Sequence, residues 1–160
     1  PAALLALEAE VVIASPRGER SVPFGDFVQG MLETALEPDE LVRAVHFPRS
    51  YEPSAAYMKM RQSASGFAIV GAAAQLRLEG RRVMDIALGI TGAADRAYRA
   101  SAAEDALRGR EATAETIAEA VRGIAAGRDL LSDIHASADY RAHLAEVFAA
   151  RAILRAASRA

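Results

Sequence analysis

The stretch Ser54–Leu78, "SAAYMKMRQSASGFAIVGAAAQLRL", decides the fold because it holds two strand sequences on either side of a short polar link. Ala55–Gln62 predicts one strand, and Phe67–Gly80 is long and apolar enough to predict a strand that is partly buried on both faces. The link between them, Ser63–Gly66, contains only small residues, as tight connections do. Arg82–Ala94 predicts a third strand, and the short connections predict an antiparallel meander.

The residues after position 100 have the periodicity of helices. Ser101 and Glu104 have the spacing of a reciprocal capping box, and Gly109 predicts the end of this first helix. A second helix is predicted from its N-cap Thr113 to Gly127. A third follows the N-cap Ser137, with one apolar stripe formed by Tyr140, Leu144, Val147, Phe148 and Leu154. The predicted class is α+β, with a three-stranded antiparallel sheet packed on a three-helix bundle.

The first fifty residues predict a separate small unit made mostly of strands. Pro1–Glu8 has the pattern of the end of a helix, and Glu10–Ser15 is expected to form a hairpin with Arg20–Phe27. Pro38 is expected to open a short helical segment, and Leu41–Phe47 to form another strand. The exposed link around residues 48–54 marks the boundary, so two domains are predicted, at residues 1–50 and 51–160.

Composition excludes several classes of function. The net charge of −2 argues against nucleic acid as a partner, since phosphate binding needs a basic excess. The absence of cysteine excludes a cysteine-ligated zinc or iron–sulfur cluster in this chain and favours a cytoplasmic location. No run of 18 apolar residues is present, so no membrane span is predicted.

Catalytic and metal-binding motifs are also missing from the sequence. The three histidines, His46, His135 and His143, lack metal-ligand spacing, and neither a nucleophile elbow nor a GxxxxGK phosphate loop occurs. One residue stands out by its rarity: Lys59 is the single lysine among 19 basic residues. The residues alone therefore predict an α+β domain of unassigned role.

The order Tyr57, Lys59, Arg61, then the link and Phe67–Ala68 before an apolar strand resembles one known family. It is similar to the FAD-carrying (medium) subunit of molybdenum hydroxylases, such as aerobic carbon monoxide dehydrogenase and xanthine dehydrogenase. Three further segments, 27–48, 88–109 and 133–153, resemble the same family in the same order. The resemblance spans essentially the whole chain.

This resemblance implies an oxidoreductase component that passes electrons from iron–sulfur clusters through FAD to an acceptor. The chain would be the C-terminal part of the subunit, inactive alone: the end of the FAD-binding domain through residue 50, followed by the C-terminal domain. The family binds the FAD pyrophosphate with glycine-rich loops of an N-terminal lobe, which nothing in this chain matches. The implied partners are that lobe, a small subunit with 2Fe–2S clusters and a large subunit with the molybdenum cofactor.

The resemblance also implies roles for particular residues. Phe67, followed by Ala68, would pack against the flavin ring system, and Lys59 would hydrogen-bond its carbonyl side. Val42 would lie beside the flavin through its backbone, and Tyr57 and Arg61 would brace the lysine. Many relatives have aspartate where Gly66 stands, directly before the aromatic residue.

Without the resemblance, the sequence favours other interpretations of the same residues. Phe67 at the head of a strand would be a core residue, and Lys59 a solvated one. Asp133 and Arg141 are interpreted as structural, tying the last helix to the sheet. A different class of function also stays open: a docking module that has the same fold and binds no flavin.

Overall fold

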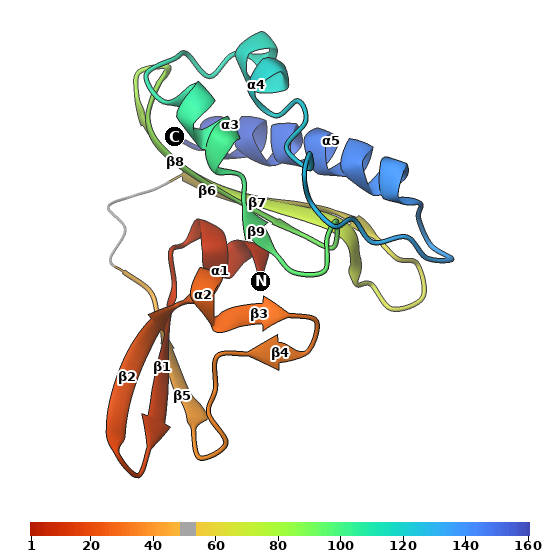
Figure 1. Ribbon diagram of the computed structural model, residues 1–160. Coiled ribbons are helices and arrows are strands. Elements are labelled where there is room, and N and C mark those ends of the chain that lie inside the picture. Colours follow the sequence, from red (N-terminus) through yellow and green to blue (C-terminus); the bar gives the residue numbers. More distant parts are fainter. Residues whose placement is uncertain (49–53) are drawn as a thin grey trace.

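The computed structural model describes residues 1–48 and 54–160, and these form two parts that lie one above the other in Figure 1. The upper part is a four-stranded sheet with helices on one face, and the lower part consists of short strands and turns. The domain boundary predicted around residues 48–54 falls largely on residues 49–53, outside the described residues.

The central sheet is the antiparallel meander that the sequence predicts. Its strands β6 (Ser54–Arg61), β7 (Ala68–Glu79) and β8 (Arg82–Thr91) lie in chain order, and β9 (Tyr98–Arg99) adds a short fourth strand at the β8 edge that the sequence did not predict. The α+β class with antiparallel strands is confirmed. A register shift between Met60 and Arg61 leaves Ile69 as the extra residue of β7 at the start of the ladder.

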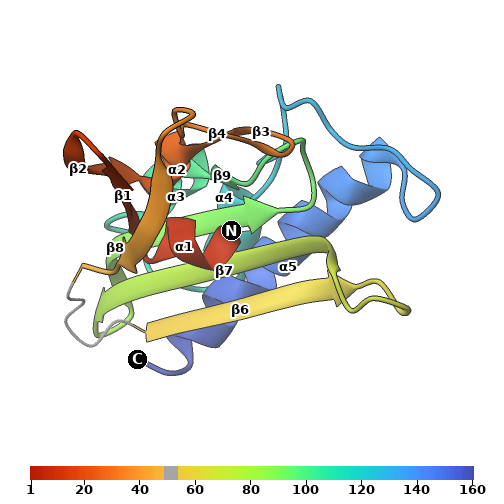
Figure 2. The same cartoon turned by 90° about the horizontal axis from the view of Figure 1, so that it is seen from below.

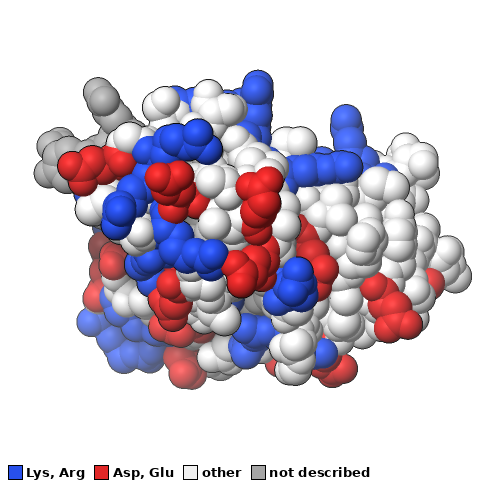
Figure 3. Space-filling model, turned by 90° about the horizontal axis from the view of Figure 1, so that it is seen from above, with Lys and Arg blue, Asp and Glu red and all other residues white. Residues whose placement is uncertain are grey.

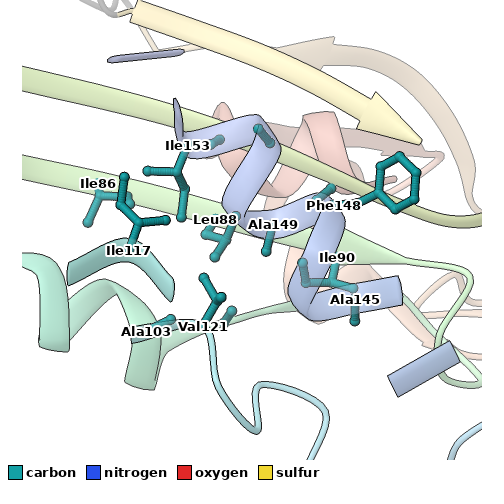
Figure 4. Packing of buried hydrophobic residues seen from close by; sticks show 14 of the residues in the cluster. Ile86, Leu88, Ile90, Ala103, Ile117, Val121, Ala145, Phe148, Ala149 and Ile153 are labelled. Atoms are coloured by element: carbon teal, nitrogen blue, oxygen red, sulfur yellow. The ribbon is translucent and has the colours of Figure 1, made fainter. Parts of the chain in front are cut away.

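Three helices cover one face of this sheet: α3 (Ser101–Leu107), α4 (Ala114–Ala120) and α5 (Ala138–Ala157). Figure 4 shows side chains of β8, α4 and α5 meeting in the core, with Ile86, Leu88 and Ile90 opposite the helices. Helix α5 turns a row of small buried residues toward the sheet, which lets its backbone approach closely: Ala145, Ala149, Ala152 and Ala156.

The helix ends confirm part of the sequence prediction. Thr113 and Ser137 are the N-caps of α4 and α5, and their side chains accept hydrogen bonds from the backbone N–H groups three residues ahead. Gly109 has the positive φ expected after a helix end. The second helix is shorter than predicted, because α4 ends at Ala120 and turns occupy the residues up to Gly127.

One helical prediction is wrong and another is only partly correct. Ser101 and Glu104 form no capping box, because Ala100 occupies the N-cap position and Glu104 turns inward. Glu104 is 3% exposed, and its carboxylate accepts hydrogen bonds from the Leu88 backbone N–H at 2.7 Å and from Arg99 Nε at 2.6 Å. The predicted stripe of α5 is correct only in part, since its first and last members, Tyr140 and Leu154, are exposed.

The N-terminal part contains α1 (Ala2–Ala6), β1 (Glu10–Ser15), β2 (Gly18–Pro23), α2 (Phe24–Phe27), β3 (Val28–Gly30), β4 (Glu33–Thr34) and β5 (Leu41–His46). Its larger sheet has the order β2-β1-β5. The predicted strand at 20–27 is wrong beyond Pro23, where the chain turns into α2 and buries Phe24 and Phe27. The helical segment predicted at Pro38 is a turn, in which the Glu40 N–H donates to the Glu37 carbonyl.

Helix α1 joins the two parts, because it packs on the face of the central sheet opposite α5. Ala2 and Ala6 bury against Ala73 of β7. At Gly89 of β8, an added Cβ atom would lie 3.0 Å from Leu5 Cβ and would overlap the Ala2 carbonyl group. Figure 2 shows that α1 lies over β7 and β8 and leaves β6 open.

Candidate functional site

The open part of the central sheet carries the candidate site. Along β6, Ser54, Ala56 and Met58 face α5. Successive side chains of a strand point to opposite faces, so Tyr57 and Lys59 project to the other face, which α1 covers only in part. Across the ladder, Tyr57 pairs with Ala73 and Lys59 with Gly71. A cationic and an aromatic side chain therefore stand next to small residues on an uncovered face.

Lys59 is fixed by the link that follows its own strand. Its half-buried Nζ donates a hydrogen bond of 2.9 Å to the carbonyl oxygen of Gly66. An ammonium group has three N–H donors, so this bond leaves two directions for other acceptors. In the described part of the chain Lys59 bonds to Gly66 rather than to Tyr57 or Arg61, and the predicted bracing of the lysine by those two residues stays a prediction.

The link of residues 62–67 is a compact, hydrogen-bonded turn. The Gln62 N–H donates to the Phe67 carbonyl at 2.8 Å, and the Gly66 N–H donates to the Gln62 carbonyl at 2.9 Å. Gly66 has φ +72°, a backbone conformation that glycine adopts without the steric cost that a side chain brings. The link also holds the Phe67 N–H, which donates to Ser65 Oγ at 3.2 Å.

Phe67 projects from this turn without a core to pack into. Its side chain is 77% exposed, so the interpretation of Phe67 as a core residue is wrong. Ala68 follows it as the first residue of β7 and is half-buried. An exposed phenylalanine that follows the carbonyl group held by Lys59 has the chemistry to contact a planar, partly apolar molecule carrying hydrogen-bond acceptors.

The Tyr57 ring lies across β7 at Gly71. A Cβ atom added to Gly71 would stand 3.1 Å from Tyr57 Cζ and 3.3 Å from Thr91 Cγ2, so only glycine leaves room for the ring in this position. The partial burial raises the pKa of the Tyr57 hydroxyl above its usual value, which keeps the group protonated and able to donate a hydrogen bond. Tyr57 therefore forms a polar border of the open face.

Val42 does not join this group of residues. It lies on β5, in the lower part of the molecule in Figure 1, while Lys59 and Phe67 lie at the central sheet and its 62–67 link. Its side chain is 44% exposed, and its strand forms one edge of the β2-β1-β5 sheet. The structure thus brings together Tyr57, Lys59, Phe67 and Ala68 and leaves Val42 at a second surface.

Other kinds of site find no support among the described residues. Residues 1–48 and 54–160 contain no group of three histidine, aspartate or glutamate side chains that could hold a metal ion. Within the same ranges, no helix is both long and apolar enough to cross a bilayer. On the helical side, basic and acidic side chains are interspersed over one half of the surface, and the other half is mostly uncharged (Figure 3).

Comparison with protein families assigns both parts of the chain. Residues 55–156 match the model described as CO dehydrogenase flavoprotein C-terminal domain. Residues 1–50 match the FAD binding domain in molybdopterin dehydrogenase. The chain belongs to the flavoprotein family of CO dehydrogenase.

Members of this flavoprotein family with established names align along the whole chain. The nicotine 6-hydroxylase medium subunit of Paenarthrobacter nicotinovorans is 31% identical over 99% of this chain and 56% of its own length. The carbon monoxide dehydrogenase medium chain of Afipia carboxidovorans is 31% identical over 100% of this chain and 56% of its own. The chain thus spans about half the length of the curated relatives it matches.

Solved structures of the same family share the fold. Reconstituted CO dehydrogenase from Oligotropha carboxidovorans superposes with a TM-score of 0.94 at 31% identity, covering 100% of this chain and 56% of that chain. Quinoline 2-oxidoreductase from Pseudomonas putida 86 gives a TM-score of 0.87 at 33% identity, covering 98% and 54%. The two-part arrangement around α1 is therefore the arrangement of this flavoprotein family.

Sequence reasoning missed two features of the site. Gly71 was read only as part of an apolar strand, although an isolated glycine inside a strand is itself a signal of close approach by another group. The Gly66 carbonyl as the acceptor for Lys59 had no such signal, because it depends on how the link folds back toward β6.

Proposed function

We propose that this chain is part of the FAD-carrying electron-transfer subunit of a molybdenum hydroxylase and forms one wall of the flavin pocket. The observation that carries the proposal is the hydrogen bond from Lys59 to the carbonyl group of Gly66, which ties the cation to the residue directly before the exposed Phe67. FAD would supply the redox chemistry, and the residues of this chain would bind and orient it.

The residues of the open face fit a flavin ring. Phe67 is 77% exposed and so offers most of its surface for contact, and aromatic stacking contributes about 0.5–1.5 kcal/mol beyond the burial of area. Lys59 has two unused N–H directions for the carbonyl oxygens of the ring, and its charge would stabilise negative charge that develops there. Tyr57 and Ala68 border the same face, and Gly71 leaves the room that the Tyr57 ring occupies there.

Strand β5 would contact the lobe that completes the FAD-binding domain. All six of its residues are exposed, and its outer edge has no strand partner among the described residues. Its exposed apolar side chains are typical of an interaction surface: Leu41, Val42 and Val45, with Phe47 just beyond the strand. Val42 would reach the flavin from this side, once the N-terminal lobe pairs with β5.

The assembly follows from the same proposal. A small subunit would hold 2Fe–2S clusters and a large subunit the molybdenum cofactor, and electrons would pass from the clusters through FAD to an acceptor. Relatives named medium subunits and medium chains support such an assembly. The domain division at residue 50 and the cytoplasmic location belong to this proposal as well.

The test is FAD uptake by the complemented protein, defined as this chain together with the N-terminal lobe that its relatives possess. After incubation with FAD and gel filtration, the visible flavin absorbance is read in the protein fraction. We expect flavin to elute with the complemented protein and not with this chain alone. Folded but colourless complemented protein would contradict the proposal and favour the docking module.

A further inference from the structure

Arg141 of α5 is the most buried basic side chain of the described residues and joins three elements. It is 4% exposed, and its Nη1 donates to the carbonyl oxygens of Ile69 at 2.6 Å and of Gly92 at 2.7 Å. Its Nη2 donates to both carboxylate oxygens of Asp133, at 2.8 and 2.7 Å. One guanidinium group therefore connects the start of β7, the residue after β8 and the loop before α5.

Both carbonyl groups need such a donor, because they lie beyond the end of the β7–β8 ladder. The last pair of that ladder is Gly71 with Thr91, and Ile69 is also skipped in the pairing of β7 with β6. Gly92 has φ +78°, and a Cβ atom there would stand 3.0 Å from the Ala68 carbonyl oxygen. Gly92 thus packs directly on the backbone that enters β7.

Asp133, on the other side of the arginine, has hydrogen-bond partners of its own. Its Oδ1 also accepts the backbone N–H groups of His135 at 2.9 Å and of Ala136 at 3.1 Å. The loop itself is tied to the end of β8, because the Leu131 N–H donates to the Ala93 carbonyl at 3.0 Å. Both members of the pair therefore bond to backbone groups as well as to each other.

This pair anchors the backbone on the C-terminal side of Phe67, two residues beyond it. On the N-terminal side, Lys59 anchors the Gly66 carbonyl, one residue before it. Phe67 and Ala68 are thus the short stretch between two hydrogen-bonded carbonyl groups, and the Phe67 side chain itself is 77% exposed.

We propose that Arg141, held by Asp133, is a positioning residue that sets Phe67 and Ala68 at the flavin ring. The inference rests on the proposed function. It gives Arg141 a role beyond tying α5 to the sheet, which the same hydrogen bonds already accomplish. A lysine at 141 would keep the charge but lose the planar fork that reaches two carbonyls and a carboxylate at once.

The test compares Arg141→Lys with Arg99→Lys in the complemented protein. Arg99 is a matched control, because it forms a similar fork to Glu104 at 2.6 and 2.8 Å but supports α3 and lies on β9. Three quantities are measured: the midpoint of urea unfolding, the dissociation constant of FAD, and hydrogen exchange of the backbone amides of residues 62–71. Asp133→Asn serves as a milder second variant, since it keeps the arginine.

We expect both lysine variants to unfold at lower urea, but only Arg141→Lys to weaken FAD binding, by about tenfold, and to accelerate exchange in residues 62–71. Asp133→Asn should shift both site readouts in the same direction by less. Equal FAD affinity and equal exchange in the two lysine variants would overturn the role and leave Arg141 purely structural. Failure of the unmodified complemented protein to bind FAD would instead overturn the proposed function, and the role at the flavin with it.

Discussion

Gly89→Ala tests how closely helix α1 packs on the central sheet. The new Cβ atom would stand 3.1 Å from the Ala2 carbonyl carbon and closer still to its oxygen. Carbon atoms in contact prefer about 3.5–4.0 Å, so the helix must retreat by roughly 0.5–1 Å. This retreat opens the contact of Ala2 and Ala6 with Ala73. Overpacking of this kind costs about 1–3 kcal/mol, and the rigid backbone of α1 places this case in the upper half of that range.

The assay is urea unfolding of this chain, with Gly25→Ala as the control. A Cβ at Gly25 would also approach α1, but at an ordinary 3.5 Å from Leu5 Cδ2. We expect Gly89→Ala to lower the unfolding midpoint by about 1 M, given a slope of about 1–3 kcal/mol/M, and to accelerate exchange of the α1 amides. Gly25→Ala should change the free energy of unfolding by less than about 1 kcal/mol. Equal midpoints for the two variants would refute the close packing of α1.

Two further predictions concern charged groups. Glu104→Gln should lower the free energy of unfolding by about 3 kcal/mol, because it leaves the partly buried Arg99 without its carboxylate partner. The control Glu119→Gln removes an exposed ion pair and should change the free energy of unfolding by less than about 0.5 kcal/mol. Comparable urea midpoints for the two variants would contradict this prediction. The free energy of unfolding should fall as the pH is lowered from about 4.5 to about 2, because two carboxylates have lowered pKa values. Hydrogen bonds from the His135 backbone and from Arg141 hold the pKa of Asp133 at about 2. Hydrogen bonds from Arg20 and from the Glu37 backbone hold the pKa of Glu40 at about 2. Carboxylates with depressed pKa values stabilise the fold above their unfolded pKa and lose this effect as they are protonated. The double variant Asp133→Asn, Glu40→Gln should be less stable at neutral pH and show a flatter acid dependence; an unchanged acid profile would contradict the assignment.

The fold was predictable from sequence where local signals decide it. Alternation and small-residue links fix the three long strands, and the Thr113 and Ser137 caps act within one helical turn. Errors arose where a distant partner decides. Glu104 has the spacing of a capping residue, but its side chain instead points to the sheet, where it accepts hydrogen bonds from the Leu88 N–H and from Arg99. Strand β9 is two residues long and is defined only by its pairing with β8.

The candidate site was likewise predictable only where local sequence decides the arrangement. Lys59 and Phe67 were paired through the resemblance to the flavoprotein family, because the residues alone predicted a solvated lysine and a core phenylalanine. In the structure Lys59 donates a hydrogen bond to the carbonyl group of Gly66, the residue before Phe67. The space that Gly71 leaves for Tyr57 depends on a neighbouring strand. The anchoring of Ile69 by Arg141 depends on a residue more than seventy positions away in sequence. An isolated glycine in a strand and a buried arginine signal that such contacts exist, but no local pattern identifies Tyr57 or Ile69 as the partner.

The measurement that tests the account most directly is the dissociation constant of FAD for the complemented protein with Lys59→Ala and with Met60→Ala. The two residues are neighbours on β6 and face opposite sides of the sheet, Lys59 the open face and Met60 the side of α5. Hydrogen bonds to charged groups contribute about 1.5–3 kcal/mol, so Lys59→Ala should weaken FAD binding roughly ten- to hundredfold with little change in the unfolding midpoint, and Met60→Ala should leave FAD binding unchanged. Equal FAD affinities in the two variants, or a larger loss in Met60→Ala, would contradict the placement of the flavin on this face.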